Sequence, residues 1–429
     1  MAIYVAEGGP RAVITDAQVT EMVRQVLDNV TDRSRMLVIP PDMTRSHSGA
    51  GPITEALHRE AGAELFHVLP ALGTHEPMSP EQIRTMYGSE IPLEAFKVHD
   101  FRHGVELLGH IPAEYVHSVS EGVLQPIIPD YDIPIQISER IVNGGYTSLI
   151  SVGQVVPHEV MGMANGVKNI LVGTAGPETI NKSHFIGAAY GMERMMGHSD
   201  TPGRRVLNRA HEEFLVPFGI VYILTVIGTD ESGEMVMRGF FAGDDLATFE
   251  RAAALSRQVN IRLLETPLAK AVVYVDPSEF KSTWLSNKSI YRTRMAMADD
   301  GELLVLAPGV EKFGEDAAID ALIRKYGYHG TPATLDAVKN HADIRENLSA
   351  AAHLIHGSSE GRFRITYATD PERLTKEEVR GVGFEWMHIN EALEQYPIET
   401  MREGFNDDLY FVRDPALGLW ALKEQFETA

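Results

Sequence analysis

Three side chains that can do chemistry lie close together in the middle of the chain. His158 and His184 flank Lys168 at spacings of ten and sixteen residues, in a segment with glycines at positions 162, 166, 173 and 176. Glycine turns let the main chain approach a ligand closely. A lysine in this setting can carry a proton, contact a phosphate or form a covalent attachment. We therefore expect the chemistry of the protein here.

Two polar loops precede this segment. Asp42-Met-Thr44-Arg45 follows an apolar run at 36–40, and a Gly-Thr-His75 sequence follows another at 65–72. An arginine fork binds a carboxylate in bidentate fashion, and an aspartate can hold that arginine or contact a hydroxyl. His75 and His158 are candidates for general acid and base catalysis, because histidine is the side chain suited to that work near neutral pH.

Each of these side chains also has a purely structural interpretation. The Asp42 loop can be a local aspartate–arginine pair, and His75 and His158 can be hydrogen-bonded loop histidines. Lys168 lies among apolar residues at an expected strand start, where it can also be an exposed strand end. His184, on a helix expected from position 177, can be a metal ligand or a core histidine. The residues alone leave these alternatives open.

The loops need a frame that brings them together. Apolar runs at 36–40, 65–72, 133–137, 148–152 and 169–172 alternate with helical patterns, one at 53–61 and one beginning at Ser79-Pro80. This alternation predicts an α/β protein with Rossmann-like parallel or mixed sheets and flanking helices. Ligands gather at the carboxyl ends of parallel strands. Five candidate residues follow predicted strands: Asp42, Arg45, His75, His158 and Thr174.

The pattern restarts near position 267, which predicts a second α/β domain. Before that point, 220–228 and 234–241 predict a hairpin and 245–264 a helix. After it we expect strands at 271–275, 303–307 and 363–367, with helices at 288–298, 316–326, 334–340 and 344–354. We predict an N-terminal catalytic and cofactor-binding domain at 1–266, rejoined by 405–429, and a C-terminal domain at 267–404, with the active site in the cleft between them.

Composition narrows the function classes. The 429 residues carry a formal net charge of -22, which argues against nucleic-acid or anionic-membrane binding. The absence of cysteine excludes disulfides, thiolate nucleophiles and iron–sulfur ligation, so a soft metal needs histidine or sulfur from outside the polypeptide. The start has no signal-peptide pattern and no run is long enough to span a membrane, so we expect a cytoplasmic enzyme.

Taken together, the Asp42 and His75 loops and the His158, Lys168 and His184 spacing resemble the nickel-dependent lactate racemase family. The resemblance extends to a second-domain stretch at 288–308 and covers most of the chain. It implies a nickel pincer nucleotide, pyridinium-3-thioamide-5-thiocarboxylic acid mononucleotide, joined covalently to Lys168. It also implies that His184 completes the nickel site, which fits the absence of cysteine because the cofactor brings the sulfur ligands.

The resemblance implies a reaction as well. A 2-hydroxy acid is inverted at C2 by hydride transfer to and from the cofactor, while His75 and His158 act as bases on opposite faces. Arg45 holds the carboxylate of the substrate, and Asp42 serves as an orienting residue. Thr44 and the turn at Gly173, Thr174 and Gly176 are expected to bind the cofactor, the turn through its phosphate.

Three departures from the family pattern concern the substrate. Ser46-His47-Ser48 follows Arg45 where lactate-acting members carry proline, and Asn-Gly-Val precedes Lys168 where Gly-Gly-Arg is usual. In the second domain, Tyr291, Arg292 and Met295 stand where the family has Tyr-Gln-x-x-Lys. We therefore expect Tyr291, Arg292 and Arg294 to line a pocket for a substrate larger or more polar than lactate, such as an aldonate or a malate-like acid. The alternative places the two arginines on a solvated helix face.

The resulting hypothesis is an isomerase, a racemase or epimerase of 2-hydroxy acids. Its partners are the small-acid substrate and the enzymes that build the cofactor, and the oligomeric state is not readable from the sequence. The alternatives are a nickel-independent dehydrogenase or a Schiff-base lyase, and a non-catalytic protein that binds small acids. No Gly-x-Gly-x-x-Gly fingerprint supports a dehydrogenase.

Overall fold

A computed structural model describes residues 2–428, and the chain within it divides into two compact units. Unit 1 comprises the residues up to Glu121, Asp130–Ser183 and Gly197–Asn260. Unit 2 comprises Gly122–Pro129, His184–Met196 and the residues from Ile261 onward. The domain bounds expected from the sequence stay a prediction.

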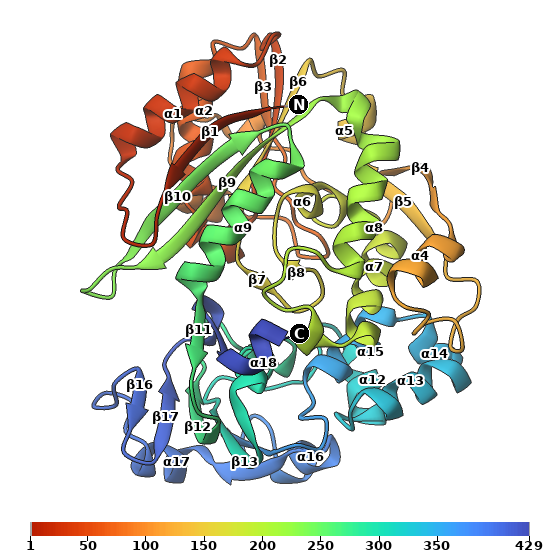
Figure 1. Ribbon diagram of the computed structural model, residues 1–429, viewed down its shortest axis with the longest axis vertical. Helices are drawn as coiled ribbons and strands as arrows, with labels where there is room; N and C mark the ends of the chain where they lie inside the picture. Colours follow the sequence, from red (N-terminus) through yellow and green to blue (C-terminus); the bar gives the residue numbers. More distant parts are fainter. Residues whose placement is uncertain (1, 429) are drawn as a thin grey trace. The chain divides into compact units, whose positions relative to one another are not determined.

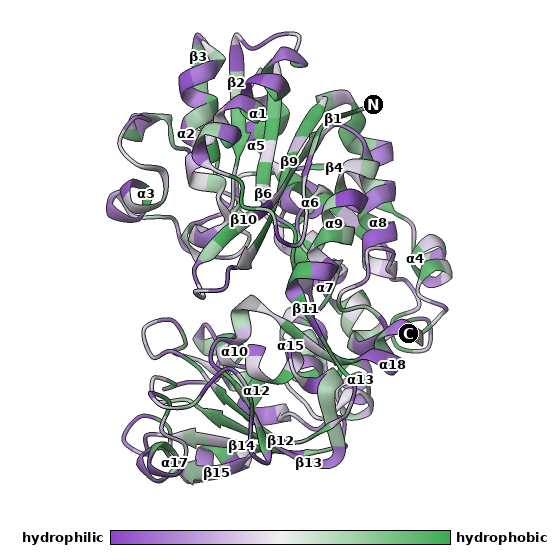
Figure 2. Ribbon diagram, turned by 60° about the vertical axis from the view of Figure 1, so that its left-hand side comes forward, coloured by the Kyte–Doolittle hydropathy of each residue, from purple (hydrophilic) through white to green (hydrophobic). Residues whose placement is uncertain are grey.

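The central sheet of unit 1 is mixed. Its strands follow the order β1-β10-β9-β6-β2-β3. The strands β3, β2, β6 and β9 are mutually parallel, and β10 is antiparallel to both of its neighbours, β9 and β1. The strands β6 and β9 are hydrophobic and buried along most of their length (Figure 2). The bounds are β1 (Ile3–Gly8), β2 (Arg35–Ile39), β3 (Leu65–Val68), β6 (Ser148–Gln154), β9 (Ile220–Thr229) and β10 (Met235–Gly243).

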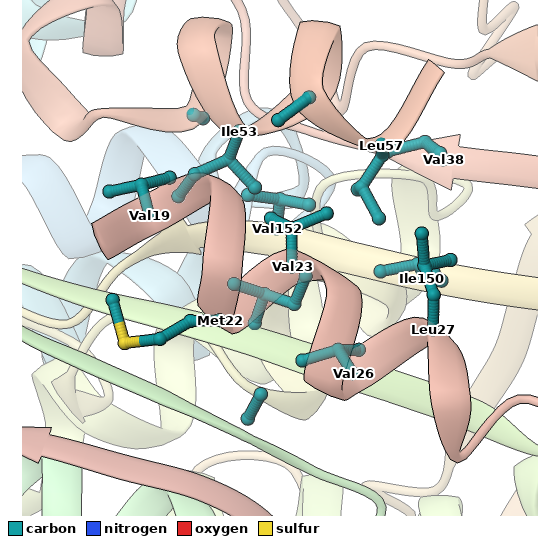
Figure 3. Close-up of a cluster of buried hydrophobic side chains, with 14 of the residues drawn as sticks. Val19, Met22, Val23, Val26, Leu27, Val38, Ile53, Leu57, Ile150 and Val152 are labelled. Carbon is teal, nitrogen blue, oxygen red and sulfur yellow. The ribbon is translucent and has the colours of Figure 1, made fainter. Parts of the chain in front are cut away.

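Helices cover both faces of this sheet. The helix α1 (Asp16–Asp28) begins with a capping box between Thr15 and Gln18 and buries one apolar stripe, and α2 (Ala50–Ala61) packs beside it. Figure 3 shows their side chains meeting those of β2 and β6. Val221 and Ile223 of β9 belong to this core, so the residues that alternate with them face the other side. There α9 (Leu246–Asn260) lies along β9 and β10 (Figure 1).

Smaller elements complete unit 1. The strands β4 (Val105–Ile111) and β5 (Ile133–Ser138) form an antiparallel pair, and β7 (Pro157–His158) and β8 (Gly162–Met163) form a two-residue hairpin. The remaining helices are α3 (Pro80–Tyr87), α4 (Ala113–Val119), α5 (Glu139–Asn143), α6 (Val167–Leu171), α7 (Pro177–Tyr190), which continues into unit 2, and α8 (Pro202–Ala210). Short helical turns are η1 (Met43–Ser48), η2 (Leu93–Ala95), η4 (His211–Leu215) and η5 (Val216–Phe218).

Unit 2 has its own sheet, ordered β15-β14-β13-β12-β17-β16, in which only β16 is antiparallel to its neighbour. The strands are β12 (Leu268–Tyr274), β13 (Met297–Leu306), β14 (Arg364–Thr369), β15 (Glu385–His388), β16 (Gly404–Asn406) and β17 (Leu409–Val412), while β11 (Ile261–Leu264) pairs with β18 (Leu419–Leu422). Its helices are α10 (Thr283–Ser286), α11 (Lys288–Tyr291), α12 (Ala317–Tyr326), α13 (Thr331–Asn340), α14 (Ala342–Arg345), α15 (Leu348–His356), α16 (Lys376–Gly381), α17 (Ile389–Gln395) and α18 (Lys423–Thr428), with turns η3 (Met192–Arg194), η6 (Arg294–Ala296) and η7 (Pro415–Leu417).

The predicted α/β class with parallel and mixed sheets and flanking helices is confirmed, and three local expectations are corrected. The run at 169–172 is not a strand but lies in and just after α6, because a short apolar run has no periodicity that separates a buried strand from a buried helix. The helix expected at 245–264 ends at Asn260, and the one expected at 288–298 breaks into α11 and η6. Within residues 405–428, β17 pairs with β12 and β18 pairs with β11.

Within the part of the chain that the structure describes, no helix is long and apolar enough to cross a membrane.

Candidate functional site

The carboxyl ends of three adjacent parallel strands carry the predicted catalytic side chains of unit 1. β2 lies between β3 and β6 in the sheet. Asp42 follows β2, His75 follows β3 and His158 follows β6. Because these ends share one edge of the sheet, the loops meet there, as expected for ligand sites in open α/β sheets.

Asp42 and His75 form a hydrogen-bonded pair. The Oδ2 atom of Asp42 lies 2.7 Å from Nδ1 of His75, and its Oδ1 accepts from the backbone N–H and the hydroxyl of Thr44, at 3.2 and 2.5 Å. Burial raises the pKa of the Asp42 carboxyl, but His75 and Thr44 together outweigh it and hold that pKa below its usual value. The carboxylate is buried, whereas the His75 side chain is 52% exposed, so the imidazole can reach a ligand.

His158 lies at the end of the β7–β8 hairpin, where it pairs with Gly162. Its side chain is buried. The backbone N–H of Val160 donates to its Nδ1 at 3.2 Å, and Oε2 of Glu159 lies 3.8 Å from the same nitrogen. The ring is therefore held by its own hairpin.

Lys168 lies in the first turn of α6, which begins after Gly166 at φ 62°. Burial is the main cause that lowers the pKa of its amine, and the positive charges of Arg45 and Arg204 act in the same direction. Against the opposing charge of Glu159, the net result is a pKa of about 7. A lysine with a pKa near 7 is half deprotonated at neutral pH, and the free amine is a nucleophile. The interpretation of Lys168 as an exposed strand end is wrong in both respects, because the residue is partly buried and helical.

Two residues that the sequence interpretation missed hold the segment before and after Lys168. Arg204 of α8 donates from Nη1 to the carbonyl of Asn165 at 3.0 Å and from Nη2 to that of Met163, and its guanidinium lies 4.1 Å from the ring centre of Phe249. Asn169 donates from Nδ2 to the carbonyl of Ile39 at 2.9 Å and to Oγ of Ser151 at 3.0 Å. Arg204 lies on a helix rich in arginine, and no local signal separates it from its neighbours.

The turn at 173–176 does not offer the phosphate cradle expected from the sequence. The amides of Gly173, Thr174, Ala175 and Gly176 already donate to carbonyls within unit 1. The Thr174 hydroxyl donates to the carbonyl of Ile170 at 2.8 Å. The turn has a packing role instead: the Gly73 amide donates to the Gly173 carbonyl at 2.8 Å, which ties the His75 loop to the Lys168 segment.

Comparison with known proteins identifies this segment. Residues 128–195 match the family model described as the lactate racemase N-terminal domain. The match includes His158, Lys168 and His184. The chain is therefore lactate racemase-like over this segment. The resemblance drawn from the sequence is therefore confirmed.

Solved structures share the fold of this lactate racemase-like chain. A crystal structure of a protein from Thermotoga maritima is similar with a TM-score of 0.81 at 24% identity, covering 97% of this chain and 100% of that one. The lactate racemase apoprotein from Thermoanaerobacterium thermosaccharolyticum is similar with a TM-score of 0.66 at 17% identity, covering 96% of this chain and 94% of that one. No curated protein matches the chain. At these identities the structures establish the fold.

The remaining candidate residues of the lactate racemase-like chain lie in unit 2. His184 is partly exposed on α7, between the buried residues Ser183 and Phe185. Across residues 2–428 no group of three or more histidine, aspartate or glutamate side chains is placed to hold a metal ion.

Tyr291, Arg292 and Arg294 are buried, so the alternative of a solvated helix face is wrong. Arg294 is 1% exposed, and its Nε lies 2.7 Å from Oε1 of Glu193. Its Nη1 donates to the carbonyls of Ile355 and Ser358, both at 3.0 Å. These contacts occupy most of the guanidinium and give Arg294 a structural role. Arg292 donates from Nη1 to the carbonyl of Gly418 at 3.4 Å.

The expected cofactor fits the described residues at its attachment point. The Lys168 amine is a nucleophile at neutral pH, and no cysteine competes for the metal. The phosphate does not fit the turn at 173–176, since its amides are occupied. A nucleotide phosphate would need donors from other residues.

Proposed function

We propose that this lactate racemase-like protein is a racemase or epimerase of 2-hydroxy acids that uses a nickel pincer nucleotide attached to Lys168. The observation that carries the proposal is the Lys168 amine, kept near a pKa of 7, at the same sheet edge as the Asp42–His75 pair. When bound, the pincer group would supply a reversible hydride acceptor, with His184 as its protein ligand.

The side chains of unit 1 would then act on the substrate. Arg45 would hold the carboxylate of the acid. Its positive charge helps to lower the pKa of Lys168, so it acts on the residue where the cofactor would be attached. Asp42 would orient His75, whose Nε2 would take the proton of the C2 hydroxyl. Hydride chemistry avoids a carbanion at a carbon whose C–H proton is weakly acidic.

The substrate proposed here is larger or more polar than lactate. The support is the exposed Ser46 and partly exposed His47 next to Arg45, where they add polar groups to the carboxylate loop. An aldonate is the first choice and a malate-like acid the second. A panel of 2-hydroxy acids assayed with the loaded enzyme tests this order.

The proposal is tested by co-expressing the chain with cofactor-building enzymes and measuring intact mass, nickel content and the modified peptide. A mononucleotide-sized adduct on Lys168 with bound nickel supports it. Lys168→Ala should lose both, whereas the exposed lysine variant Lys281→Ala should keep both. His75→Ala should keep the adduct and lose turnover. An unmodified Lys168 under these conditions would contradict the proposal.

One observation favours a second candidate. A lysine with a pKa near 7 is also typical of Schiff-base enzymes, so a lyase acting on keto acids is the alternative. Borohydride treatment of the unloaded protein with a 2-keto acid distinguishes the two. Reductive trapping on Lys168, together with turnover in the absence of nickel, would favour the lyase.

A further inference from the structure

A group of basic side chains in unit 1 lies away from the carboxyl ends of the strands. Arg35 is the first residue of β2, and Tyr146 comes just before β6, so both lie at the amino ends of these strands. His67 lies in β3, the edge strand that pairs with β2. The candidate catalytic loops follow the carboxyl ends of the same strands, so this group is separate from the candidate functional site.

Two rings form the centre of the group. Nδ1 of His67 lies 2.9 Å from the hydroxyl of Tyr146, and the rings meet edge to face with their centres 5.8 Å apart. Both side chains are partly buried. Phe66 packs against the core that α1 and α2 cover, so the ring of His67 faces the other side of the sheet.

Three cations surround these rings, and we call them the basic cluster: Arg35, Lys97 and Arg140. Each is anchored by a hydrogen bond to a backbone carbonyl, from Nε of Arg35 at 2.8 Å, Nε of Arg140 at 3.1 Å and Nζ of Lys97 at 2.7 Å. The two arginines are exposed and the lysine is partly exposed. Because a guanidinium has five N–H groups and an ammonium has three, each side chain keeps donors for a ligand.

The basic cluster has no acidic partner. Across residues 2–428, no carboxylate forms an ion pair with any of its three side chains, whereas other exposed arginines such as Arg24 and Arg59 pair with glutamates. Asp32, close to Arg35 in the sequence, accepts instead from the backbone N–H and hydroxyl of Ser34. The chain has 60 acidic and 38 basic side chains, so a shortage of carboxylates does not explain the unpaired cations.

Both rings lie in the positive field of the cluster. Burial lowers the pKa of His67, and the charges of Lys97, Arg140 and Arg35 lower it further. Burial raises the pKa of Tyr146, and the charges of Arg140 and Arg35 oppose that rise. The same cations therefore act on two side chains from different segments, which means that their charges converge.

We propose that Arg35, Lys97 and Arg140 form a second anion site in unit 1, which binds a phosphate-type dianion, either free or as the monoester of a small molecule. Arginine contacts two oxygens of such a group at once, and lysine binds it as a point charge. A carboxylate has one charge and two oxygens, so it would leave part of the cluster unused. The net charge of -22 disfavours a nucleic acid or an anionic membrane as the ligand.

Occupation of this site should change the titration of His67. A bound dianion offsets the charges of the basic cluster, so it should raise the pKa of His67. The coupling is reciprocal, and protonation of His67 should tighten binding of the dianion by about threefold to tenfold. Tyr146 is the remaining titratable side chain at the centre, and its hydroxyl stays neutral over the range in which histidine titrates.

The first test is histidine ring NMR of the unloaded full chain between about pH 5 and 8. The titration is recorded in sodium sulfate and in sodium chloride at equal ionic strength. Sulfate is the probe because it stays a dianion throughout, and His67→Gln assigns the signal by its loss. We expect His67 to titrate at higher pH in sulfate, with an effect that saturates. The same titration in both salts would overturn the inference.

The second test measures the affinity of the unloaded chain for inorganic phosphate, glycerol 3-phosphate and acetate by calorimetry. Arg140→Gln and Lys97→Gln should each weaken binding of both phosphates by about threefold to fivefold, as expected for an exposed charge pair. Arg59→Gln is the matched control, because it removes an exposed arginine that pairs with Glu90. Acetate should bind more weakly than either phosphate. Phosphate affinity that is equal in the cluster variants and the control would overturn the inference.

A third arm separates a small ligand from a lipid headgroup. Phosphatidylglycerol vesicles carry the same phosphate chemistry on a surface, and we expect the chain not to sediment with them. Sedimentation with vesicles, without binding of glycerol 3-phosphate in solution, would overturn the proposal of a small-molecule site. These tests need no cofactor, so their outcome is independent of the proposed function.

Discussion

At the scale of single residues, the Asp42 carboxylate decides what His75 can do. One of its oxygens is taken by Thr44, through an N–H and a hydroxyl, and the other faces Nδ1 of His75. Each oxygen thus has its own partner. The same arrangement of carboxylate and imidazole orients the histidine of a Ser-His-Asp triad.

Asp42→Asn should therefore reverse the His75 tautomer. Thr44 donates twice to Oδ1 and fixes the carbonyl of the new amide on its own side, so the NH₂ group must face Nδ1 of His75 and donate to it. Nε2 then carries the proton and cannot act as a base. Turnover should fall by about 10³–10⁴, as for the equivalent change in a triad. Histidine NMR of the variant checks the tautomer, and an unchanged Nδ1–H signal would contradict this reasoning.

Lys168 should make the stability of the unloaded protein depend on pH. Its pKa is about 7 in the folded chain and ordinary, near 10.4, in the unfolded chain, so the unfolded state binds more protons between these values. Lys168→Met should therefore raise the free energy of unfolding at pH 6, by about 2 kcal/mol or more. The gain should shrink as pH rises from 7 towards 10. Urea unfolding of both proteins across pH measures the difference, with Lys281→Met as the exposed control.

At the scale of elements, α6 is too short to fix its own position. It has five residues, and isolated helices of that length are unstable. Its position comes from neighbours: Asn169 joins it to β2 and β6, and Arg204 of α8 holds the backbone just before it. The orientation of Lys168 is set by these contacts.

Asn169→Ala should remove two buried hydrogen bonds and leave the Ile39 carbonyl and the Ser151 hydroxyl without this donor. We expect a loss of about 1–3 kcal/mol in the free energy of unfolding. Hydrogen exchange should become faster at the amides of α6. Gln258→Ala, which removes an exposed amide on α9, is the control and should change little. Equal effects from both variants would contradict a specific role for Asn169.

At the scale of the whole molecule, the chain leaves unit 1 after Ser183 and re-enters it at Gly197. The intervening residues belong to unit 2, and Glu193 anchors them there through Arg294, with Nε–Oε1 at 2.7 Å and Nη2–Oε2 at 3.0 Å. Burial raises the pKa of the Glu193 carboxyl, but Arg294 outweighs it and holds that pKa below its usual value. The pair therefore stabilises the fold at pH values at which the Glu193 carboxylate is ionised.

Glu193→Gln should leave the Arg294 guanidinium, which is 1% exposed, with only the more distant Glu360 carboxylate, 3.9 Å from Nη1, as a counterion. Losing one partner of a buried pair costs about 3–5 kcal/mol, and we expect about 2 kcal/mol here because Glu193 is 36% exposed. A carboxyl whose pKa is lower in the folded chain stabilises the fold at pH values above its pKa in the unfolded chain. This stabilisation is lost as the pH falls through the pKa of the folded chain. The difference between wild type and variant should thus be full at pH 7 and shrink in acid. Thermal unfolding of wild type and variant, at pH 7 and at acidic pH, checks this difference.

The sequence by itself predicted a resemblance to lactate racemases, the α/β class and the loops that carry Asp42, His75, His158 and Lys168. Strand-ending polar residues and glycine turns are local patterns, and parallel strands bring their carboxyl ends to one edge of the sheet. The spacing of the His158, Lys168 and His184 segment pointed to the lactate racemase-like family, which the comparisons then supported.

Only the tertiary structure decided what each residue does within that frame. The helical state of 167–171, the occupied amides of the turn at 173–176 and the pairing of Arg294 with Glu193 depend on partners remote in the sequence. The tautomer of His75 likewise depends on a carboxylate that lies 33 residues away. A single sequence shows which donors and acceptors exist, but burial and pairing set their energies, and both are properties of the folded chain.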